Sequence, residues 1–374
     1  MVSVTSTSPY AAYQNYAASY SGTATSSTTP QQPQSQSGTD SAATSVTLSD
    51  DALAALAERD FAAVLAEAHA KLLALLEEAG RTSPVKGGKL ALDLSGLDQR
   101  ELFAMSSDAS FSPDEREAAG LEMQRRFEAA LSGPAAIAEV IGNYVGLYKA
   151  AAAYLDSLGA EERASADWRA GRDAIAEGLK QLQTRPGTLP DLGPNDPVAL
   201  YLALTEAGKG VEPSMPDLAS NARTTLDRLY ADAHARGKVP TFNRNTIVGQ
   251  YIDVSGFSSG ALSSIVLDTA GQFNAEETSA ARSALHARSG ATLLAGFQDA
   301  NKSGDPTAFS RNIITAFSSL SAEERQAAGW SDQLYQAAMQ SYVTTTKLMD
   351  MFSQSTGGNN SGAPNLASLL GGMQ

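Results

Sequence analysis

Hydrophobic positions in the first long segment of the chain, residues 49–79, recur at the spacing of an amphipathic helix. The stripe consists of Leu53, Leu56, Phe61, Val64, Leu65, Leu72, Leu75 and Leu76. Ser49 before it and Gly80 after it are a predicted N-cap and a predicted stop. A short β-like run, KLALDL, then ends at a Ser-Gly pair. The pattern further predicts helices at about 97–106, 113–132 and 135–157, and a last long helix that begins near Trp168.

The same order of segments returns in the second half of the chain. At a distance of 160 positions, Asp93, Ser95, Gly96, Leu102 and Asp108 match Asp253, Ser255, Gly256, Leu262 and Asp268. At a distance of 162, Phe111, Glu115, Ala118, Ala119, Arg126 and Leu131 match Phe273, Glu277, Ala280, Ala281, Arg288 and Leu293. This second register continues to the only two tryptophans, Trp168 and Trp330. We therefore predict an internal duplication.

The predicted fold is mainly α, with two tandem homologous helical domains, each with at most one short β-strand, flanked by disordered tails. The predicted parts are a tail at 1–47, domain 1 at 48–185, a Pro-rich linker at 186–197, domain 2 at 198–352 and a tail at 353–374. The linker has Pro186, Pro190, Pro194 and Pro197, which favour a semi-rigid spacer.

The two tails differ from the middle of the chain in composition. In residues 1–47, Asp40 is the only charged residue, and Ser, Thr, Gln and Pro dominate, which is typical of disorder. Tyr10, Tyr13, Tyr16 and Tyr20 nevertheless fall at helical spacing. This segment is either a disordered tail or a helix that folds against a partner such as an export chaperone.

Charge and cysteine content exclude several classes of function. The net charge is −14, which disfavours nucleic acid and anionic membrane surfaces as partners. The absence of Cys excludes disulfides, thiolate zinc sites and Cys nucleophiles. There is no run of 18 apolar residues, so no membrane span is predicted. Because no Lys or Arg precedes Arg59 and no long apolar run opens the chain, no cleavable signal peptide is predicted.

Two segments, SSDASFSPDE and LDTAGQFNAEE, resemble the second half of a degenerate EF-hand loop. The resemblance implies a helix–loop–helix that binds Ca²⁺ through oxygen ligands. The candidate ligands are Ser106, Asp108, Glu115, Asp268 and Glu277. The first loop position is Ala104 or Val266, where the family has a carboxylate. As the alternative, Ser112 and Asn274 are plain helix N-caps, each followed by Glu three residues later. No other cofactor is predicted.

A second motif, GFSSG at 256–260, matches the G-x-S-x-G pattern of a serine hydrolase. Ser258 would be its nucleophile. His286 is the only histidine that follows it in the chain, only 28 residues later on a predicted helix. The matched segment of the first half, GLDQR, has no serine. A hydrolase is therefore kept as an alternative only.

We expect a non-catalytic, exported or secretion-associated bacterial scaffold that acts through protein contacts. The charge-poor N-terminus resembles the uncleaved export signals of flagellar and type III substrates. That resemblance implies an export chaperone or a secretion or flagellar component as partner. It also implies a secreted or cell-surface location without a cleaved signal, the alternative being the cytoplasm. A Ca²⁺-responsive module is the other class of function that remains open.

Overall fold

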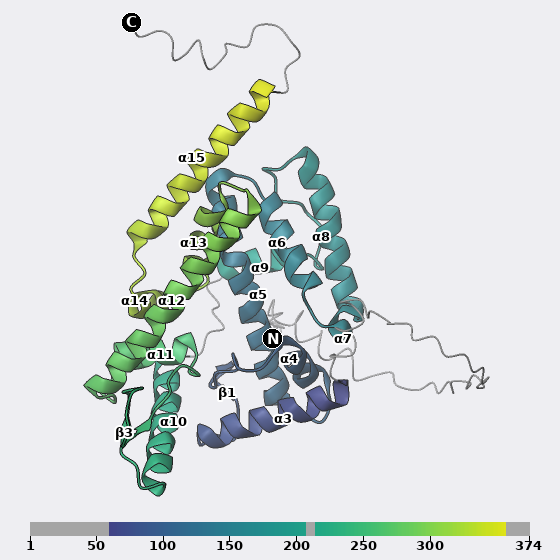
Figure 1. Ribbon diagram of the computed structural model, residues 1–374. Helices are drawn as coiled ribbons and strands as arrows, with labels where there is room; N and C mark the ends of the chain where they lie inside the picture. Colours follow the sequence, from purple (N-terminus) through teal and green to yellow (C-terminus); the bar gives the residue numbers. More distant parts are fainter. Residues whose placement is uncertain (1–59, 207–213, 357–374) are drawn as a thin grey trace, which may run out of the picture.

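A computed structural model describes residues 60–206 and 214–356 of this mainly α-helical protein (Figure 1). The first half contains α3 (Phe61–Glu78), β1 (Val85–Lys86), β2 (Lys89–Leu90), α4 (Gln99–Ser107), α5 (Pro113–Ile141), α6 (Val145–Asp156), α7 (Ala160–Arg163), α8 (Ala166–Thr184) and α9 (Pro197–Glu206). The second half contains α10 (Met215–Ala235), β3 (Pro240–Thr241), β4 (Gln250–Tyr251), α11 (Ser259–Leu267), α12 (Ala275–Ser303), α13 (Ala308–Ser318), α14 (Ala322–Ala328) and α15 (Asp332–Thr356). The tail predicted at 1–47 and residues 357–374 of the other predicted tail lie outside the described residues.

The strands differ from the prediction of at most one per domain. β1 pairs with β2 in an antiparallel register, and β3 pairs with β4 in a parallel one. Within residues 60–206 and 214–356, each half therefore has two strands of two residues. The physical reason is that the backbone N–H and C=O groups of an extended segment need a partner. The β-like run KLALDL that the sequence indicates contains β2 alone, and its partner β1 lies before that run.

The end of α5 also differs from the prediction. The helix was expected to stop near residue 132, before Pro134, but it continues to Ile141. A proline in a helix interior removes one hydrogen bond and kinks or breaks the helix when nothing compensates. Here α5 residues before and after Pro134, such as Leu131 and Ile137, are packed in hydrophobic clusters, and the helix continues through it. The actual stop is Gly142, whose φ of 62° gives the left-handed C-cap that glycine adopts without steric strain. Consequently α5 reaches far enough to contact the second half.

Two hydrophobic clusters form the core of the first half. One joins α3, the β1–β2 hairpin, α4 and the start of α5 around Leu72, Leu102 and Phe111. The other joins the later part of α5 to α6, α8 and α9 around Tyr148 and Ile175.

The segment predicted as a linker packs on the first half. Leu192 contacts the cluster around Tyr148, and the Tyr148 hydroxyl donates to the Asp196 carboxylate at 2.6 Å. Val198 and Tyr201, two of the three buried residues of α9, belong to the same cluster. The predicted start of domain 2 at residue 198 instead places α9, except Pro197, in the second domain.

The second half has its own core and also shares one with the first half. Its own cluster joins α10, α11, α12 and α14 around Leu226, Leu262 and Leu285. A further cluster joins Ile137 of α5 to Ile314 of α13 and to α15. The two halves are thus packed together through α5 and α13 and are not connected by the chain alone.

Candidate functional site

In the first predicted loop, the candidate ligands are held by local hydrogen bonds. The buried Ser106 hydroxyl donates to the Phe103 carbonyl at 2.9 Å. The Asp108 carboxylate accepts the Ser110 N–H at 2.8 Å. Hydrogen bonding with the Ser110 side chain, and then this backbone bond, lowers the pKa of Asp108. Glu115 accepts the Ser112 N–H at 2.7 Å in a capping box at the start of α5. The predicted N-cap with its Glu at the third position is confirmed here.

In the second predicted loop, Asp268 has a left-handed backbone with φ 37°. Its carboxylate accepts the Gln272 N–H at 2.7 Å and the Phe273 N–H at 3.3 Å, so it closes the turn between α11 and α12. Glu277 forms a capping box with Asn274 at the start of α12, as predicted from the sequence. Both carboxylates therefore bind backbone N–H groups of the loop itself.

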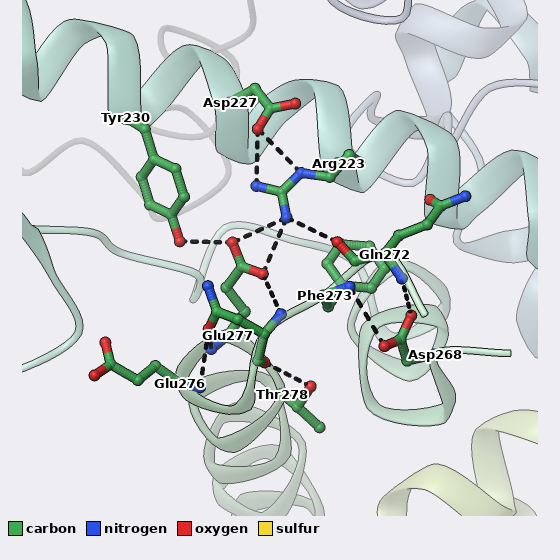
Figure 2. Close-up of polar contacts among 10 residues, drawn as sticks. Arg223, Asp227, Tyr230, Asp268, Gln272, Phe273, Glu276, Glu277 and Thr278 are labelled. Carbon is green, nitrogen blue, oxygen red and sulfur yellow. Dashed lines mark hydrogen bonds and ion pairs between the residues drawn. The ribbon is translucent and has the colours of Figure 1, made fainter. Parts of the chain in front are cut away.

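Glu277 is also the centre of a polar cluster with α10, which Figure 2 shows. Glu277 is 2% exposed. The Arg223 guanidinium lies 2.9 Å from Glu277 Oε1, and the Tyr230 hydroxyl donates to the same oxygen at 2.7 Å. Burial and then the bond to Glu277 raise the pKa of Tyr230. This cluster fixes α10 to the start of α12.

The candidate metal ligands remain a prediction, and the geometry gives each of them another role. In residues 60–206 and 214–356, no group of three or more His, Asp or Glu side chains is arranged to hold a metal ion. Ca²⁺ needs six to eight oxygen ligands. Glu277 would have to leave Arg223 and Tyr230 in order to become one of them.

The two loops carry a matched aromatic contact. The His69 ring stacks on Phe111 with centroids 3.7 Å apart, and the Arg223 guanidinium lies over Phe273 at 5.4 Å. Arg223 follows His69 by 154 positions, a register in which Val64, Ala68 and Leu72 of α3 match Leu218, Ala222 and Leu226 of α10. All six of these apolar residues are buried. In each half, one side chain of the first helix thus covers the aromatic residue of the loop before the long helix.

A second matched contact involves arginines on the long helices. The Arg126 Nη2 donates to the Leu97 carbonyl at 2.7 Å, and the Arg288 Nη2 donates to the Ser255 carbonyl at 2.7 Å and to Phe257. Arg126 Nη2 also donates to the Ser95 carbonyl at 3.3 Å. Each arginine therefore binds the serine carbonyl of an Asp-x-Ser-Gly turn and the carbonyl of the residue that follows the glycine. The aspartate of each turn accepts the N–H of its serine, at 3.0 Å in the first half and 2.9 Å in the second.

Ser258 of the GFSSG motif is the N-cap of α11. Its hydroxyl accepts the Ala261 N–H at 3.0 Å. His286 lies on α12, and its ring is next to Gly329. A Cβ atom added to that glycine would be 3.9 Å from His286 Nε2. The serine hydroxyl thus has a capping role that explains its position before the helix.

A cavity of about 850 Å³ lies between the two halves. Both Asp-x-Ser-Gly turns line it, together with α5, α10 and the start of α14. Its charged lining residues are Glu78, Asp93, Glu122, Arg125, Asp253, Arg288 and Glu324. Carboxylates outnumber guanidinium groups, so the cavity is acidic. Since its walls come from both halves, its shape depends on how the halves pack.

Two glutamates in matched positions at the start of α7 and α14 are withdrawn from water. Burial raises the pKa of Glu162 to about 7, against a hydrogen bond from Gln99 that lowers it. Burial also raises the pKa of Glu324, which forms a capping box with Ser321. These shifts are a consequence of packing at two helix starts.

The two tryptophans are half-buried and hold the ends of helices. The Trp168 indole N–H donates to the Leu155 carbonyl at the end of α6, at 2.8 Å. The Trp330 ring packs edge-on against Phe317 of α13 at 6.4 Å, and its N–H donates to Ser289 at 3.1 Å. Leu155 and Phe317 are 162 positions apart, in the register of the tryptophans.

The last turns of α15 carry an exposed apolar surface. Its residues are Leu348, Met349, Met351 and Phe352, and we call it the α15 apolar surface. Met351 is 58% exposed and Phe352 is 61% exposed. Earlier on the same helix, Tyr335, Ala338, Met339 and Tyr342 pack into the core shared with α5 and α13. The packed stripe and the exposed surface belong to one helix, which extends past α13 at the top of Figure 1.

Comparisons with protein-family models, with curated proteins and with solved structures find no match to this chain. Within residues 60–206 and 214–356, no helix is long and apolar enough to cross a membrane.

Sequence reasoning did not identify Arg223, Tyr230 or the α15 apolar surface. The sequence pairs the segment LASNARTTLDRLYADAHARG, which is α10, with the first long helix, but this pair lies in a register of 154 positions and not 160 or 162, so the sequence did not align Arg223 with His69. The signal for α15 was present, since its last turns contain four apolar residues within five positions.

Proposed function

We propose that the chain is an internal duplication of one helical domain, and that it is a non-catalytic scaffold acting through protein contacts. Equal element lengths favour the duplication. α4 and α11 each span nine residues, and α5 and α12 each span 29. Their positions keep the distances of 160 and 162 found in the sequence.

The matched contacts add an independent reason. Arg126 and Arg288 each bind the corresponding turn of their own half, and His69 and Arg223 cover aromatic residues at corresponding positions, Phe111 and Phe273. Contacts of this kind are inherited with a fold, whereas helix length alone is not specific. The domain limits that we propose remain 48–185 and 198–352, although α9 packs on the first half.

The observation that carries the function is the α15 apolar surface. Exposed apolar side chains clustered on one helix end are typical of a protein docking site. α15 has only Asp332, Lys347 and Asp350 as charged residues. The partner would therefore bind this surface in an apolar groove of its own, as in helix-in-groove recognition, and not through charged side chains. The methionines favour a surface that adapts its shape to the partner.

The polar groups of the motifs favour a scaffold over an enzyme. Ser258, Glu115 and Glu277 are all engaged in helix caps. A catalytic group must reach a substrate, whereas these groups complete the backbone hydrogen bonding of helix starts.

The export part of the proposal rests on the composition of residues 1–47, which are charge-poor and resemble uncleaved export signals. A fusion of residues 1–47 to a β-lactamase reporter tests it in a bacterium with a working type III or flagellar apparatus. We expect reporter activity in the medium, and none in a strain whose export ATPase is deleted. Activity that is retained inside both strains would contradict export by this segment.

Docking is tested separately, with a photo-reactive phenylalanine analogue in place of Phe352 in cells of the source organism. We expect one discrete adduct with another protein. The purified partner should then bind the wild-type chain and lose at least tenfold in affinity for M351S/F352S, because two apolar contacts are removed. Equal affinity for both chains would contradict the proposal.

A further inference from the structure

The connection between β3 and β4 differs from its counterpart in the first half. β1 and β2 are joined by Gly87 and Gly88 alone, both with positive φ. β3 and β4 are joined by the eight residues 242–249, here called the β3–β4 loop. The second half thus has a longer loop at the same place in the order of elements.

This loop presents apolar side chains to solvent. Ile247 is 98% exposed and Val248 is 83% exposed, and Val239 beside β3 is 67% exposed. Neighbouring β-branched residues with so little cover form an apolar tip. A single exposed apolar residue is ordinary, but a tip of adjacent ones indicates a contact surface.

The tip is held in place by bonds within the loop. The Asn243 side chain accepts the Asn245 N–H at 3.0 Å, and the Thr246 hydroxyl accepts the Gly249 N–H at 2.9 Å. A Cβ atom on Gly249 would stand 2.8 Å from the Val239 carbonyl oxygen and from Thr241. The loop therefore closes tightly, and this closure directs Ile247 and Val248 outward.

The segment that carries the apolar tip is basic. Arg236 and Lys238 before β3 and Arg244 in the loop are all exposed, although the chain as a whole has a net charge of −14. The acidic residues nearest in the chain, Asp232 and Asp253, border this segment on either side. The Arg244 Nε donates to the Tyr251 hydroxyl at 2.8 Å, which keeps the guanidinium beside the loop.

We propose that the β3–β4 loop docks on an anionic lipid bilayer, with Ile247 and Val248 in the interfacial region and Arg236, Lys238 and Arg244 at the lipid phosphates. Ile247 and Val248 are almost fully exposed, which suits insertion into a deformable layer, whereas a protein partner would need a matching pocket. Cations near an anionic leaflet add attraction. The acidic remainder of the chain opposes this only weakly, because repulsion beyond the Debye length is screened.

The position of the loop agrees with this docking. Figure 1 shows β3 and the C-terminal end of α10 at the lower left edge of the molecule, far from the end of α15. A bilayer at this edge leaves the α15 apolar surface accessible. The inference is therefore independent of the proposed docking of a protein on α15.

Vesicle sedimentation of the full chain tests the proposal. One set of vesicles contains phosphatidylcholine alone, and the other contains equal parts of phosphatidylcholine and phosphatidylglycerol. We expect binding to the second set, which weakens when salt is raised. I247S/V248S should reduce the partition about tenfold or more, and R236Q/K238Q should remove most of the dependence on phosphatidylglycerol.

Leu73→Ser is the matched control, because Leu73 is an apolar residue on α3 that is 63% exposed. It should bind vesicles like the wild type. Three results would overturn the proposal: no sedimentation with anionic vesicles, equal losses in L73S and I247S/V248S, or binding that soluble polyglutamate abolishes and I247S/V248S leaves unchanged. The last result would indicate an acidic protein as the partner.

Discussion

Thr315 on α13 lies directly against Gly133 on α5, so closely that a Cβ atom on Gly133 would stand 2.5 Å from the Thr315 Cα. The contact joins residues 182 positions apart and brings the backbones of two helices from different halves together. Ile137 and Ile314 continue the same interface. The two halves therefore behave as one packed body at this point.

Gly133→Ala should destabilise the whole protein by about 1–3 kcal/mol, because an added methyl group overpacks the α5–α13 contact. Gly120→Ala is the matched control on the same helix, since a Cβ atom there has open space around it. That variant should be neutral or more stable by about 0.5–1 kcal/mol, the helix propensity difference between the residues. Urea unfolding of both variants measures this. Equal effects would show that the halves do not meet as described.

Because Arg126 and Arg288 make corresponding contacts, removing either side chain should lower the free energy of unfolding by a similar amount. Arg126→Ala and Arg288→Ala should each lower the free energy of unfolding by about 1.5–3 kcal/mol, since each guanidinium binds carbonyls of a turn. Arg282→Ala on the exposed side of α12 is the control and should change stability by less than about 0.5 kcal/mol. Thermal unfolding compares the three variants. A large loss in only one of the two matched variants would weaken the case for duplication.

Glu277 and Glu115 occupy matched positions but have different surroundings. Glu277→Gln should destabilise by about 2–3 kcal/mol, because Arg223 and Tyr230 lose a charged partner in a mostly buried cluster. Glu115→Gln should have a small effect, since Glu115 accepts only its capping bond at the helix start. Chemical unfolding measures the difference.

Calorimetric titration of the wild-type chain with Ca²⁺ tests the EF-hand alternative directly. We expect no saturable heat, because the loop carboxylates accept protein donors. Saturable binding that Glu277→Gln abolishes and Glu115→Gln preserves would instead establish a calcium site in the second loop.

Glu162 predicts a pH dependence of stability. Because burial raises its folded-state pKa to about 7 from the ordinary 4.5, folding favours the protonated carboxyl. Below pH 4.5 the carboxyl is protonated in both states, so Glu162 does not change the free energy of unfolding. As the pH rises from 4.5 to 7, Glu162 lowers the free energy of unfolding, and above 7 this loss stays constant. Glu162→Gln should therefore gain stability relative to the wild type at pH 8, by up to about 3 kcal/mol, and little at pH 4.

Glu161→Gln serves as the comparison, because its effect on the free energy of unfolding should depend on pH in the opposite direction. The Arg100 guanidinium lowers the pKa of Glu161, so its carboxylate stabilises the fold above the ordinary pKa. This variant should lose a little stability at pH 8 and none at very low pH. If both variants responded to pH in the same direction, the burial of Glu162 would not be the cause.

The local features of the fold were predictable from the sequence. The capping boxes at Ser112, Asn274 and Ser321 follow from side chains three residues apart, and the structure has all three. Gly80 has the left-handed φ expected after a helix end. Such features depend on neighbours in the chain, which a sequence displays directly.

Long-range features were not predictable in the same way. The pairing of Arg223 with Glu277 joins residues 54 positions apart, and nothing in the spacing of either residue indicates the other. Nothing in the sequence around Gly133 indicates that the backbone of α13 lies against this residue. The end of α5 was misplaced because Pro134 resembles a helix stop, whereas packing on both sides of it continues the helix.

The most direct test of the account is the affinity of the partner captured at Phe352 for two purified chains, the wild type and M351S/F352S. Both changes are at exposed positions, so circular dichroism should give the same melting curve for both chains. The account predicts a loss of at least tenfold in affinity for the variant, with L73S binding as the wild type does. Unchanged affinity in M351S/F352S, or an equal loss in L73S, would contradict the assignment of α15 as the docking helix.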